Sequence, residues 1–337
     1  MIREYLKLSR SFNAVLTGIS PVMGAIAMQQ YNILILLILF IIGFLGHTFG
    51  FVFNDIIDYK IDITSKEISD RPLVSGSIKL SNAWVFAISS ITIAFIIAFS
   101  FAYYTQNYFP IMILSFSAFF IILYDLISKK IPFMDIFVAI GVFFFILYGA
   151  STAVDNISEI TNIAWIVCLL GSIQVLFMQI IVGGMKDIEN DYKKGAKTAA
   201  VRMGVRVIEK KLKVSIIFKT VAYVIQTINI ILIYIPYFII PLFINQNINL
   251  KYFQWIIIAI ITFMMFTLSY KLLFMKKFER KQARRYIGSH YITNFALVPI
   301  LLMTLNPWAG LLVFFPALGF ILSNIILHGT ILQPKTM

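Results

Sequence analysis

Long runs of apolar residues limit how this chain can fold more than any other feature of its sequence. Roughly 18 to 20 apolar residues are needed for a helix to cross a bilayer. Hydrophobic residues make up 60% of the 337 residues and charged residues 13%, far from the balance of a soluble globular domain. Runs of about spanning length lie at 13–30, 33–53, 82–104, 109–128, 133–153, 162–185, 213–244, 251–275, 287–306 and 308–330. The sequence therefore predicts an all-α polytopic membrane protein.

The last two runs leave the number of transmembrane helices at nine or ten. Asn306-Pro307 lies between them, and such a pair is typical either of a tight turn between helices or of a break within a re-entrant segment. Polar stretches at 54–81 and 186–213 each follow a pair of spans and each open with acidic residues. This repetition predicts two four-helix repeats plus C-terminal helices around a central cavity. We expect residues 1–337 to form a single membrane-embedded domain.

Basic residues indicate the orientation of the chain. Most of the 28 Lys and Arg fall in the N-terminal segment or near alternate turns, whereas the opposite turns hold Lys251, Asp155 and Glu159. This is the positive-inside pattern, so we expect an integral protein of the cytoplasmic membrane with its N-terminus and both acidic stretches on the cytoplasmic side. The net charge of +13 then reflects topology. Nucleic acid is not expected as a partner, because the aromatic residues lie in the apolar spans.

Two acidic motifs lie just beyond apolar spans. In the first, Asn54, Asp58 and Asp62 are spaced i, i+4 and i+8, so on a helix they project from one face. In the second, Asp187 and Asp191 repeat the i, i+4 spacing. Carboxylates stacked in this way repel one another at a membrane edge. Bound divalent cations would relieve that repulsion.

The residue types favour magnesium and a phosphate-bearing ligand. Oxygen donors without nearby His or Cys suit Mg²⁺, which is usually held by one or two carboxylates plus substrate phosphates. Arg71, together with Lys129 and Lys130 after the fourth span, could contact phosphate oxygens. A phosphate ligand whose other end lies among apolar helices is a lipid diphosphate, and membrane lipids surround the site.

Three ordered motifs carry a resemblance to a known family. They are Asn54-Asp55-x-x-Asp58-x-x-x-Asp62, Asp70-Arg71-Pro72-Leu73-x-Ser75-Gly76 and Asp187-x-Glu189-x-Asp191-x-x-x-Gly195-x-x-Thr198. This order resembles the UbiA superfamily of intramembrane prenyltransferases, which includes the 4-hydroxybenzoate polyprenyltransferases. The resemblance implies that Asn54, Asp58, Asp62, Asp187 and Asp191 bind Mg²⁺ and diphosphate, the four aspartates being catalytic. Beside them, Arg71, Lys129 and Lys130 are expected at the diphosphate, and Tyr124 is left open between stacking on the carbocation and lying in the aromatic belt.

The implied reaction is Mg²⁺-dependent transfer of an isoprenoid chain from an allylic polyprenyl diphosphate. Departure of diphosphate would leave a carbocation, which Phe- and Tyr-rich helices would shield from water. The short second motif resembles the branches with aromatic or quinone-precursor acceptors, so such an acceptor is the first expectation. The spacing from Tyr124 to Lys129 resembles the branch that uses a glycerol-type lipid alcohol, which is an alternative. Cyclisation without an acceptor and a cation-coupled transporter are further alternatives.

Four features outside the motif faces carry less direct expectations. Asp55 points away from the face of Asn54 and is expected to cap or support the site, while Glu189 is left open between a direct and an indirect role. His47, within Gly43-x-x-Gly46-His47-x-x-Gly50, is expected to be a hydrogen-bonded core residue at a close helix contact. The basic run 276–285 is expected to be a solvated cytoplasmic turn.

Asp58→Asn should abolish diphosphate release, because it removes a charge from the metal-binding face while keeping the size of the side chain. Release of diphosphate from an allylic donor by purified protein measures this. Normal turnover in the variant would contradict the metal-binding role of the first motif.

Overall fold

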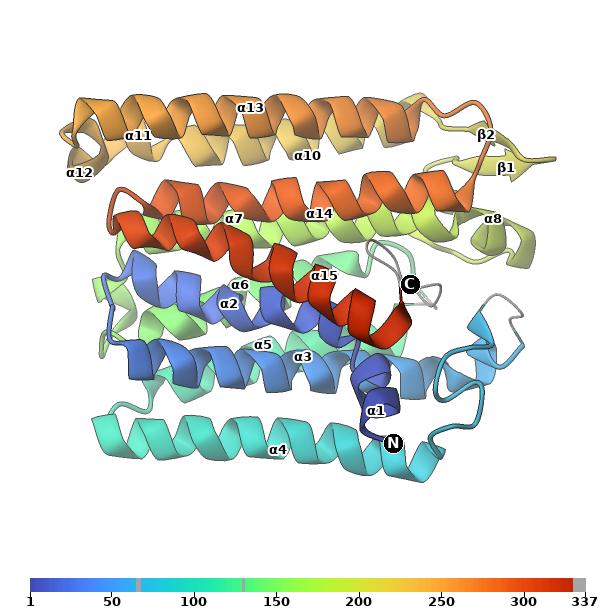
Figure 1. Cartoon of the computed structure of the whole chain (residues 1–337), viewed down its shortest axis with the longest axis horizontal. Coiled ribbons are helices and arrows are strands. Elements are labelled where there is room, and N and C mark those ends of the chain that lie inside the picture. The colour runs from blue at the N-terminus through green and yellow to red at the C-terminus, as the bar shows by residue number, and fades with distance from the viewer. Residues whose placement is uncertain (65–67, 129–130, 330–337) are drawn as a thin grey trace. The chain divides into compact units, whose positions relative to one another are not determined.

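Each predicted apolar run contains a helix in the computed structural model, which describes residues 1–64, 68–128 and 131–329 (Figure 1). These helices are α2 (Ser11–Ala27), α3 (Ile33–Asp62), α4 (Leu80–Thr105), α5 (Phe109–Ile127), α6 (Asp135–Ser151), α7 (Asn162–Phe177), α10 (Ile216–Tyr234), α13 (Ile248–Leu273), α14 (Arg280–Leu302) and α15 (Phe314–His328). The predicted all-α fold class is confirmed.

Shorter elements connect the long helices. They are α1 (Ile2–Leu8), α8 (Gly184–Lys194), α9 (Ala199–Arg202), α11 (Pro236–Ile239), α12 (Pro241–Ile244), the 3₁₀ turns η2 (Ile157–Glu159) and η4 (Pro307–Val313), the π-helical segment η3 (Met178–Gly183), and strands β1 (Arg206–Ile208) and β2 (Lys211–Lys213). The two strands form an antiparallel hairpin in which Val207 lies opposite Leu212.

The chain is an integral membrane protein. Within the described part of the chain, seven helical segments are long and apolar enough to span a bilayer. Helices α2 and α6 are apolar but have 17 residues each, and α14 begins with charged residues. Asn306-Pro307 separates α14 from η4, which continues directly into α15. The number of nine or ten spans stays a prediction.

The residues group into two compact units, each with its own core. Unit 1 comprises Met1–Leu126, Phe144–Ile160 and Phe314–Met337, and unit 2 comprises Ile127–Phe143 and Thr161–Val313. Unit 1 carries the first acidic motif and unit 2 the second. The predicted four-helix repeats and central cavity remain predictions.

Small residues bring the helices of unit 1 close together. A Cβ atom added at Gly43 of α3 would lie 2.7 Å from the Cα atom of Gly18 in α2. Helix α4 buries a regular stripe of small side chains, Ala83, Ala87, Ser90, Ala94, Ala98 and Ala102. Lipid tails are as apolar as the helices, so close van der Waals packing is the main attraction between them. Small side chains permit that packing.

His47 is a structural residue of the α2–α3 contact, as the sequence predicts. Its Nδ1 atom lies 2.8 Å from the hydroxyl oxygen of Thr17, and its Nε2 atom lies 3.3 Å from the carbonyl oxygen of Arg10. Both ring nitrogens therefore have partners within the fold, and the ring is buried. His47 joins the middle of α3 to the start of α2.

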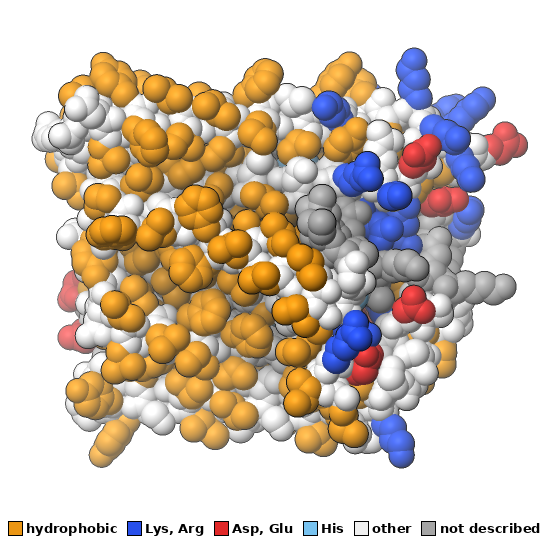
Figure 2. All heavy atoms as spheres, in the orientation of Figure 1, with side chains coloured by type: hydrophobic (Ala, Val, Ile, Leu, Met, Phe, Trp, Pro, Cys, Tyr) orange, Lys and Arg blue, Asp and Glu red, His pale blue; other side chains and the backbone are white. Residues whose placement is uncertain are grey.

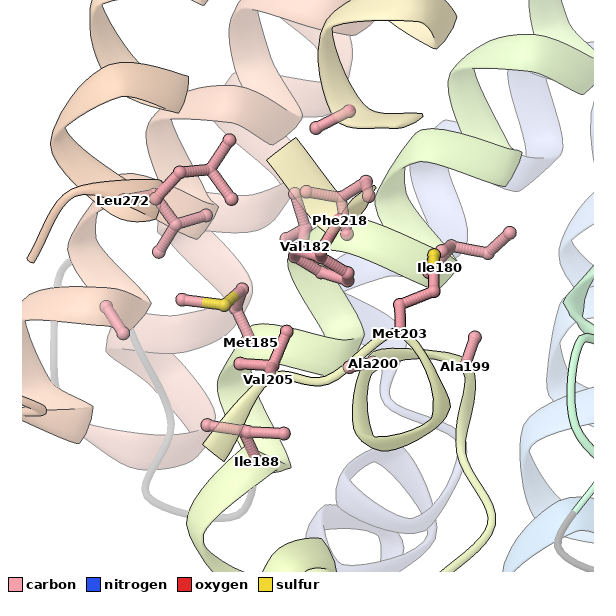
Figure 3. Packing of buried hydrophobic residues seen from close by; sticks show 14 of the residues in the cluster. Ile180, Val182, Met185, Ile188, Ala199, Ala200, Met203, Val205, Phe218 and Leu272 are labelled. Atoms are coloured by element: carbon pink, nitrogen blue, oxygen red, sulfur yellow. The ribbon is translucent and has the colours of Figure 1, made fainter. Parts of the chain in front are cut away.

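The core of unit 2 fixes the helix that carries the second acidic motif. Figure 3 shows Met185 and Ile188 of α8 among apolar side chains from α9, η3, α10 and α13. A Cβ atom added at Gly184 would lie 2.8 Å from the Cβ atom of Ala200, so the absence of a side chain lets α9 approach α8. The π-helical turn η3 directly precedes α8. Such turns are frequent at functional sites.

Basic side chains gather at one end of the helices in each unit. In the face shown in Figure 2, apolar side chains cover most of the helical surface, while Lys and Arg cluster near α1 in unit 1 and near the β-hairpin in unit 2. In unit 2 the hairpin also binds the chain before α14, because the backbone N–H of Phe278 donates to the carbonyl of Lys210 at 2.7 Å. The basic ends of α10, α13 and α14 are thereby held together.

Gly43→Ala should destabilise the protein by about 1 to 3 kcal/mol, because the new methyl group would meet the backbone of α2 rather than a movable side chain. Gly46→Ala is the matched control on the same helix, since its Cβ atom would lie 3.7 Å from the nearest atom, in the ring of Phe145. Thermal unfolding in detergent measures both variants. Equal stability of the two would contradict a close contact at Gly43.

Candidate functional site

The first acidic motif occupies the last turns of α3. This helix continues to Asp62, well past the apolar residues that begin it, so the predicted helical placement of Asn54, Asp58 and Asp62 is confirmed. Asp58 and Asp62 are 7% and 8% exposed. Burial of carboxylates costs free energy unless they are paired, hydrogen-bonded or bound to metal. These residues are therefore not a headgroup-solvated helix end.

Asp55 is the centre of a buried group of ion pairs in unit 1. Its Oδ1 atom accepts from Nη2 of Arg10 at 2.7 Å and lies 3.6 Å from Nη1 of Arg71. Arg71 also donates from Nη1 to Oδ2 of Asp62 at 2.6 Å. Asp55 therefore holds two guanidinium groups beside the acidic face, and its supporting role in a functional site stays a prediction.

Arg10 contacts the acidic motif, although the sequence motifs did not predict it as a site residue. It precedes α2 in a left-handed backbone conformation, with φ of 47°, and its guanidinium lies 5.0 Å from the ring centre of Phe51 on α3. The signal in the sequence is its place in Arg10-Ser11-Phe12-Asn13, where the first long apolar run begins. Its contact with Asp55 joins the N-terminal segment to α3.

The loop after α3 places Arg71 by packing as well as by charge. Leu73 is buried in a cluster with Leu8, Phe53 and Ile56. The backbone N–H of Ile78 donates to the carbonyl of Pro72 at 3.1 Å and closes the loop. Gly76 has φ of 74°, a conformation that favours glycine. The Nε atom of Arg71 is buried and has no hydrogen-bond partner among the described residues, which leaves one guanidinium donor for a ligand.

Asn54 contacts a carboxylate that the sequence did not single out. Its Nδ2 atom donates to Oδ1 of Asp125 on α5 at 3.0 Å. Asp125 is 5% exposed, and its Oδ2 atom has no hydrogen-bond partner among the described residues. The only signal was its position next to Tyr124, which lies half-buried on α5. Lys129 and Lys130, predicted at the diphosphate, lie outside the described residues.

The second acidic motif lies on α8 in unit 2, where the predicted helix is confirmed. Asp187 binds two cations: its Oδ1 atom lies 3.2 Å from Nη2 of Arg280, and its Oδ2 atom lies 3.3 Å from Nζ of Lys186. Its side chain is 40% exposed. Asp191 follows one turn later, and Gly195 ends the helix with φ of 65°. The second motif is thus half-open to the surroundings.

Two expectations near the second motif are refined by these contacts. Glu189 pairs with Lys193 at 2.8 Å across one helical turn, an arrangement typical of a helix surface, which favours its indirect role. The basic run 276–285 was expected to be a solvated turn, but α14 begins within it at Arg280. Part of this run is therefore helix, and its first helical residue, Arg280, contacts the carboxylate of Asp187.

The donor chemistry of the site fits a hard divalent cation. The acidic faces offer carboxylate and amide oxygens, and the nearby ring of His47 is engaged within the fold. Across residues 1–64, 68–128 and 131–329, no three His, Cys, Asp or Glu side chains come together closely enough to hold a metal ion. Mg²⁺ is normally completed by water and substrate phosphates rather than by a full protein cage. The residues therefore fit Mg²⁺ bound together with a diphosphate.

The chain matches a family model and several characterised proteins. The model of the UbiA prenyltransferase family matches residues 15–267. Digeranylgeranylglyceryl phosphate synthase of Sulfurisphaera tokodaii is 26% identical over 244 residues, which cover 70% of this chain and 79% of that protein. The synthase of the same name from Thermococcus sibiricus is 29% identical over 221 residues, covering 64% and 73%.

Solved structures share the fold. A structure described for digeranylgeranylglyceryl phosphate synthase has a TM-score of 0.61 at 23% identity and covers 92% of this chain and 98% of its own. A UbiA homologue from Aeropyrum pernix K1 has a TM-score of 0.66 at 13% identity, covering 88% and 97%. A UbiA homologue from Archaeoglobus fulgidus bound to GPP and Mg²⁺ has a TM-score of 0.60 at 16% identity, covering 94% and 99%.

Asp55→Asn should lower the free energy of unfolding by about 3 kcal/mol, because two largely buried guanidinium groups would lose their shared charge partner. Asp70→Asn removes an exposed carboxylate from the neighbouring loop and is the matched control. Thermal unfolding and limited proteolysis of the loop at 68–79 measure the effect. The prediction is wrong if both variants unfold and are cleaved as the unchanged protein is.

Proposed function

Because the chain belongs to the UbiA prenyltransferase family, it is a membrane-embedded prenyltransferase, and we propose that its acceptor is a glycerol-type lipid alcohol bearing a phosphate. The donor in this proposal is an allylic polyprenyl diphosphate. The reaction forms an ether. The C–O bond to diphosphate breaks with its electron pair on diphosphate, the acceptor oxygen bonds to the allylic carbon, and the hydroxyl proton is released.

The names of the relatives support the proposed acceptor. Both synthases described above act, by name, in making digeranylgeranylglyceryl phosphate, and this chain spans 79% and 73% of their lengths. The sequence placed an aromatic or quinone-precursor acceptor first and the glycerol-type alcohol second. The relatives support the second, in agreement with the spacing from Tyr124 to Lys129. No comparable support exists for transport.

We further propose Mg²⁺ as the metal. Its candidate ligands are Asn54, Asp58 and Asp62 in unit 1, and Asp187 and Asp191 in unit 2. When bound, Mg²⁺ neutralises the charge that develops on the leaving diphosphate. The support is the oxygen-only donor set and the A. fulgidus homologue bound to GPP and Mg²⁺. We propose that this chemistry and the N-terminus lie on the cytoplasmic side of the membrane, which the positive-inside pattern of the sequence supports.

The chain's own cations complete the binding of diphosphate in this proposal. Arg71 is held by Asp55 and Asp62, and its buried Nε atom can donate to a phosphate oxygen. Lys129 and Lys130 add positive charge after α5, and Tyr124 offers an aromatic face or hydroxyl nearby. The isoprenoid chain lies among apolar side chains, which exclude water from the allylic carbon.

The acceptor assignment is tested with purified protein, geranylgeranyl diphosphate and Mg²⁺, offering geranylgeranylglyceryl phosphate, hydroxybenzoate and dihydroxynaphthoate separately. We expect product mass with the glycerol lipid, and none with the aromatic acids, because the site is proposed to bind the lipid phosphate as well as the alcohol. Mass spectrometry of the extracted lipids measures the outcome.

Product should disappear when Mg²⁺ is chelated and in Asp58→Asn, but persist in Asp155→Asn, which removes an exposed carboxylate from the opposite turn. An adduct of an aromatic acid alone would overturn the acceptor assignment. A metal-dependent hydrocarbon formed without acceptor would instead identify a cyclase.

A further inference from the structure

The contact between Asn54 and Asp125 is built by helix packing. Both residues lie on unit 1 helices, Asn54 on α3 and Asp125 on α5, and Nδ2 of the asparagine donates to Oδ1 of the aspartate at 3.0 Å. One helical turn earlier on each helix, Gly50 lies against Ile121, and a Cβ atom added at Gly50 would lie 3.4 Å from the Cγ2 atom of Ile121. The two helices therefore meet at a fixed place, and the polar contact lies one turn beyond it.

This contact determines which end of the Asn54 amide is available to a ligand. A side-chain amide has one donor end and one acceptor end, and here the Oδ1 atom of Asp125 accepts from the donor end. With Nδ2 turned to Asp125, Oδ1 is turned away from it. The reversed amide would place its oxygen against the accepting Oδ1 atom of Asp125 and would lose this hydrogen bond.

The available oxygen is the atom that a cation needs. Only Oδ1 of an asparagine can bind Mg²⁺, because the amide nitrogen has no available lone pair. Among the described residues, no hydrogen bond engages the Oδ1 atom of Asn54. Asn54 shares its helix face with Asp58, one turn later. An oriented amide thus adds a neutral oxygen donor to the acidic face.

We propose that Asp125 is a positioning residue, which turns the Asn54 amide so that its oxygen is presented to the divalent cation of the diphosphate site. The inference rests on the proposed function for the identity of that site. Asp125 is buried, so its hydrogen bond to the amide is shielded from competition by water. Residues that orient metal ligands through hydrogen bonds commonly affect metal affinity strongly.

The test compares two substitutions of nearly equal size. Asp125→Asn keeps an oxygen that can accept from Nδ2 of Asn54, whereas Asp125→Leu fills the space and accepts nothing. We expect Asp125→Leu to weaken Mn²⁺ binding about 10- to 100-fold and Asp125→Asn to bind close to the unchanged protein. Electron paramagnetic resonance of free Mn²⁺, with full-length protein in detergent and no donor or acceptor, measures binding directly. Asp125→Ala replaces the Leu variant if the latter does not fold.

Two further variants separate positioning from a general effect on α5. In the Asn54→Ala background, Asp125→Leu should cause no additional loss of Mn²⁺ binding, because the amide that it orients is absent. Ser115→Ala removes a hydrogen bond of 2.8 Å from an exposed serine to Ile111 on the same helix and should bind Mn²⁺ normally. Thermal unfolding of every variant shows whether it is folded.

Several outcomes would overturn the proposal. These are unchanged Mn²⁺ binding in Asp125→Leu, a loss in Asp125→Asn as large as in Asp125→Leu, additive losses in the double variant, or no Mn²⁺ binding by the unchanged protein. Prenyl transfer is measured separately. The expected binding pattern without prenyl product would support positioning and contradict the proposed function, whereas product with unaltered binding in Asp125→Leu would do the reverse.

Discussion

A carboxylate buried at the end of a membrane helix must be paired, and the site in unit 1 depends on how that requirement is met at Asp55. Desolvation of an ion costs several kcal/mol, which is recovered only by close partners of opposite charge. Asp55 meets two guanidinium groups, one from the segment before α2 and one from the loop after α3. One side chain therefore fixes the two segments that border the acidic face.

Close helix packing makes such pairing possible. Gly18 and Gly43 let α2 approach α3, and the stripe of small side chains on α4 is buried in the same unit. With lipid on the outside, these contacts replace the hydrophobic driving force available to soluble bundles. The polar end of α3 is thus held on a rigid support, which a binding site for a small, highly charged group requires.

Unit 2 supports its acidic motif in a different way. Met185 and Ile188 anchor α8 in an apolar core (Figure 3). Asp187 is half-open and is paired with Arg280 and Lys186, in contrast to the nearly buried Asp58 and Asp62. The first motif is therefore more strongly desolvated than the second. A charge placed beside the first motif experiences the stronger field, because burial reduces screening by water.

The sequence by itself determined the membrane helices and the helical placement of both acidic motifs. Spans of about 20 apolar residues have few ways to satisfy their backbone in lipid, and the i, i+4 spacing of acidic residues follows directly from helical geometry. The ordered motifs also predicted the family, and the match of the family model over residues 15–267 established it. The acceptor was harder to predict from the sequence, because the short motifs describe the diphosphate site that all family members share.

Only the tertiary structure decided which side chains meet. Arg10 and Asp55 are 45 positions apart, and Asn54 and Asp125 are 71 positions apart, so no local pattern links them. Arg280 joins Asp187 across 93 positions, which turned an apparently solvated basic run into part of the site. Such contacts depend on the separation and rotation of packed helices, which the glycines at their crossings set. Apolar periodicity specifies that a helix forms and which face is buried, but not the partner at its polar end.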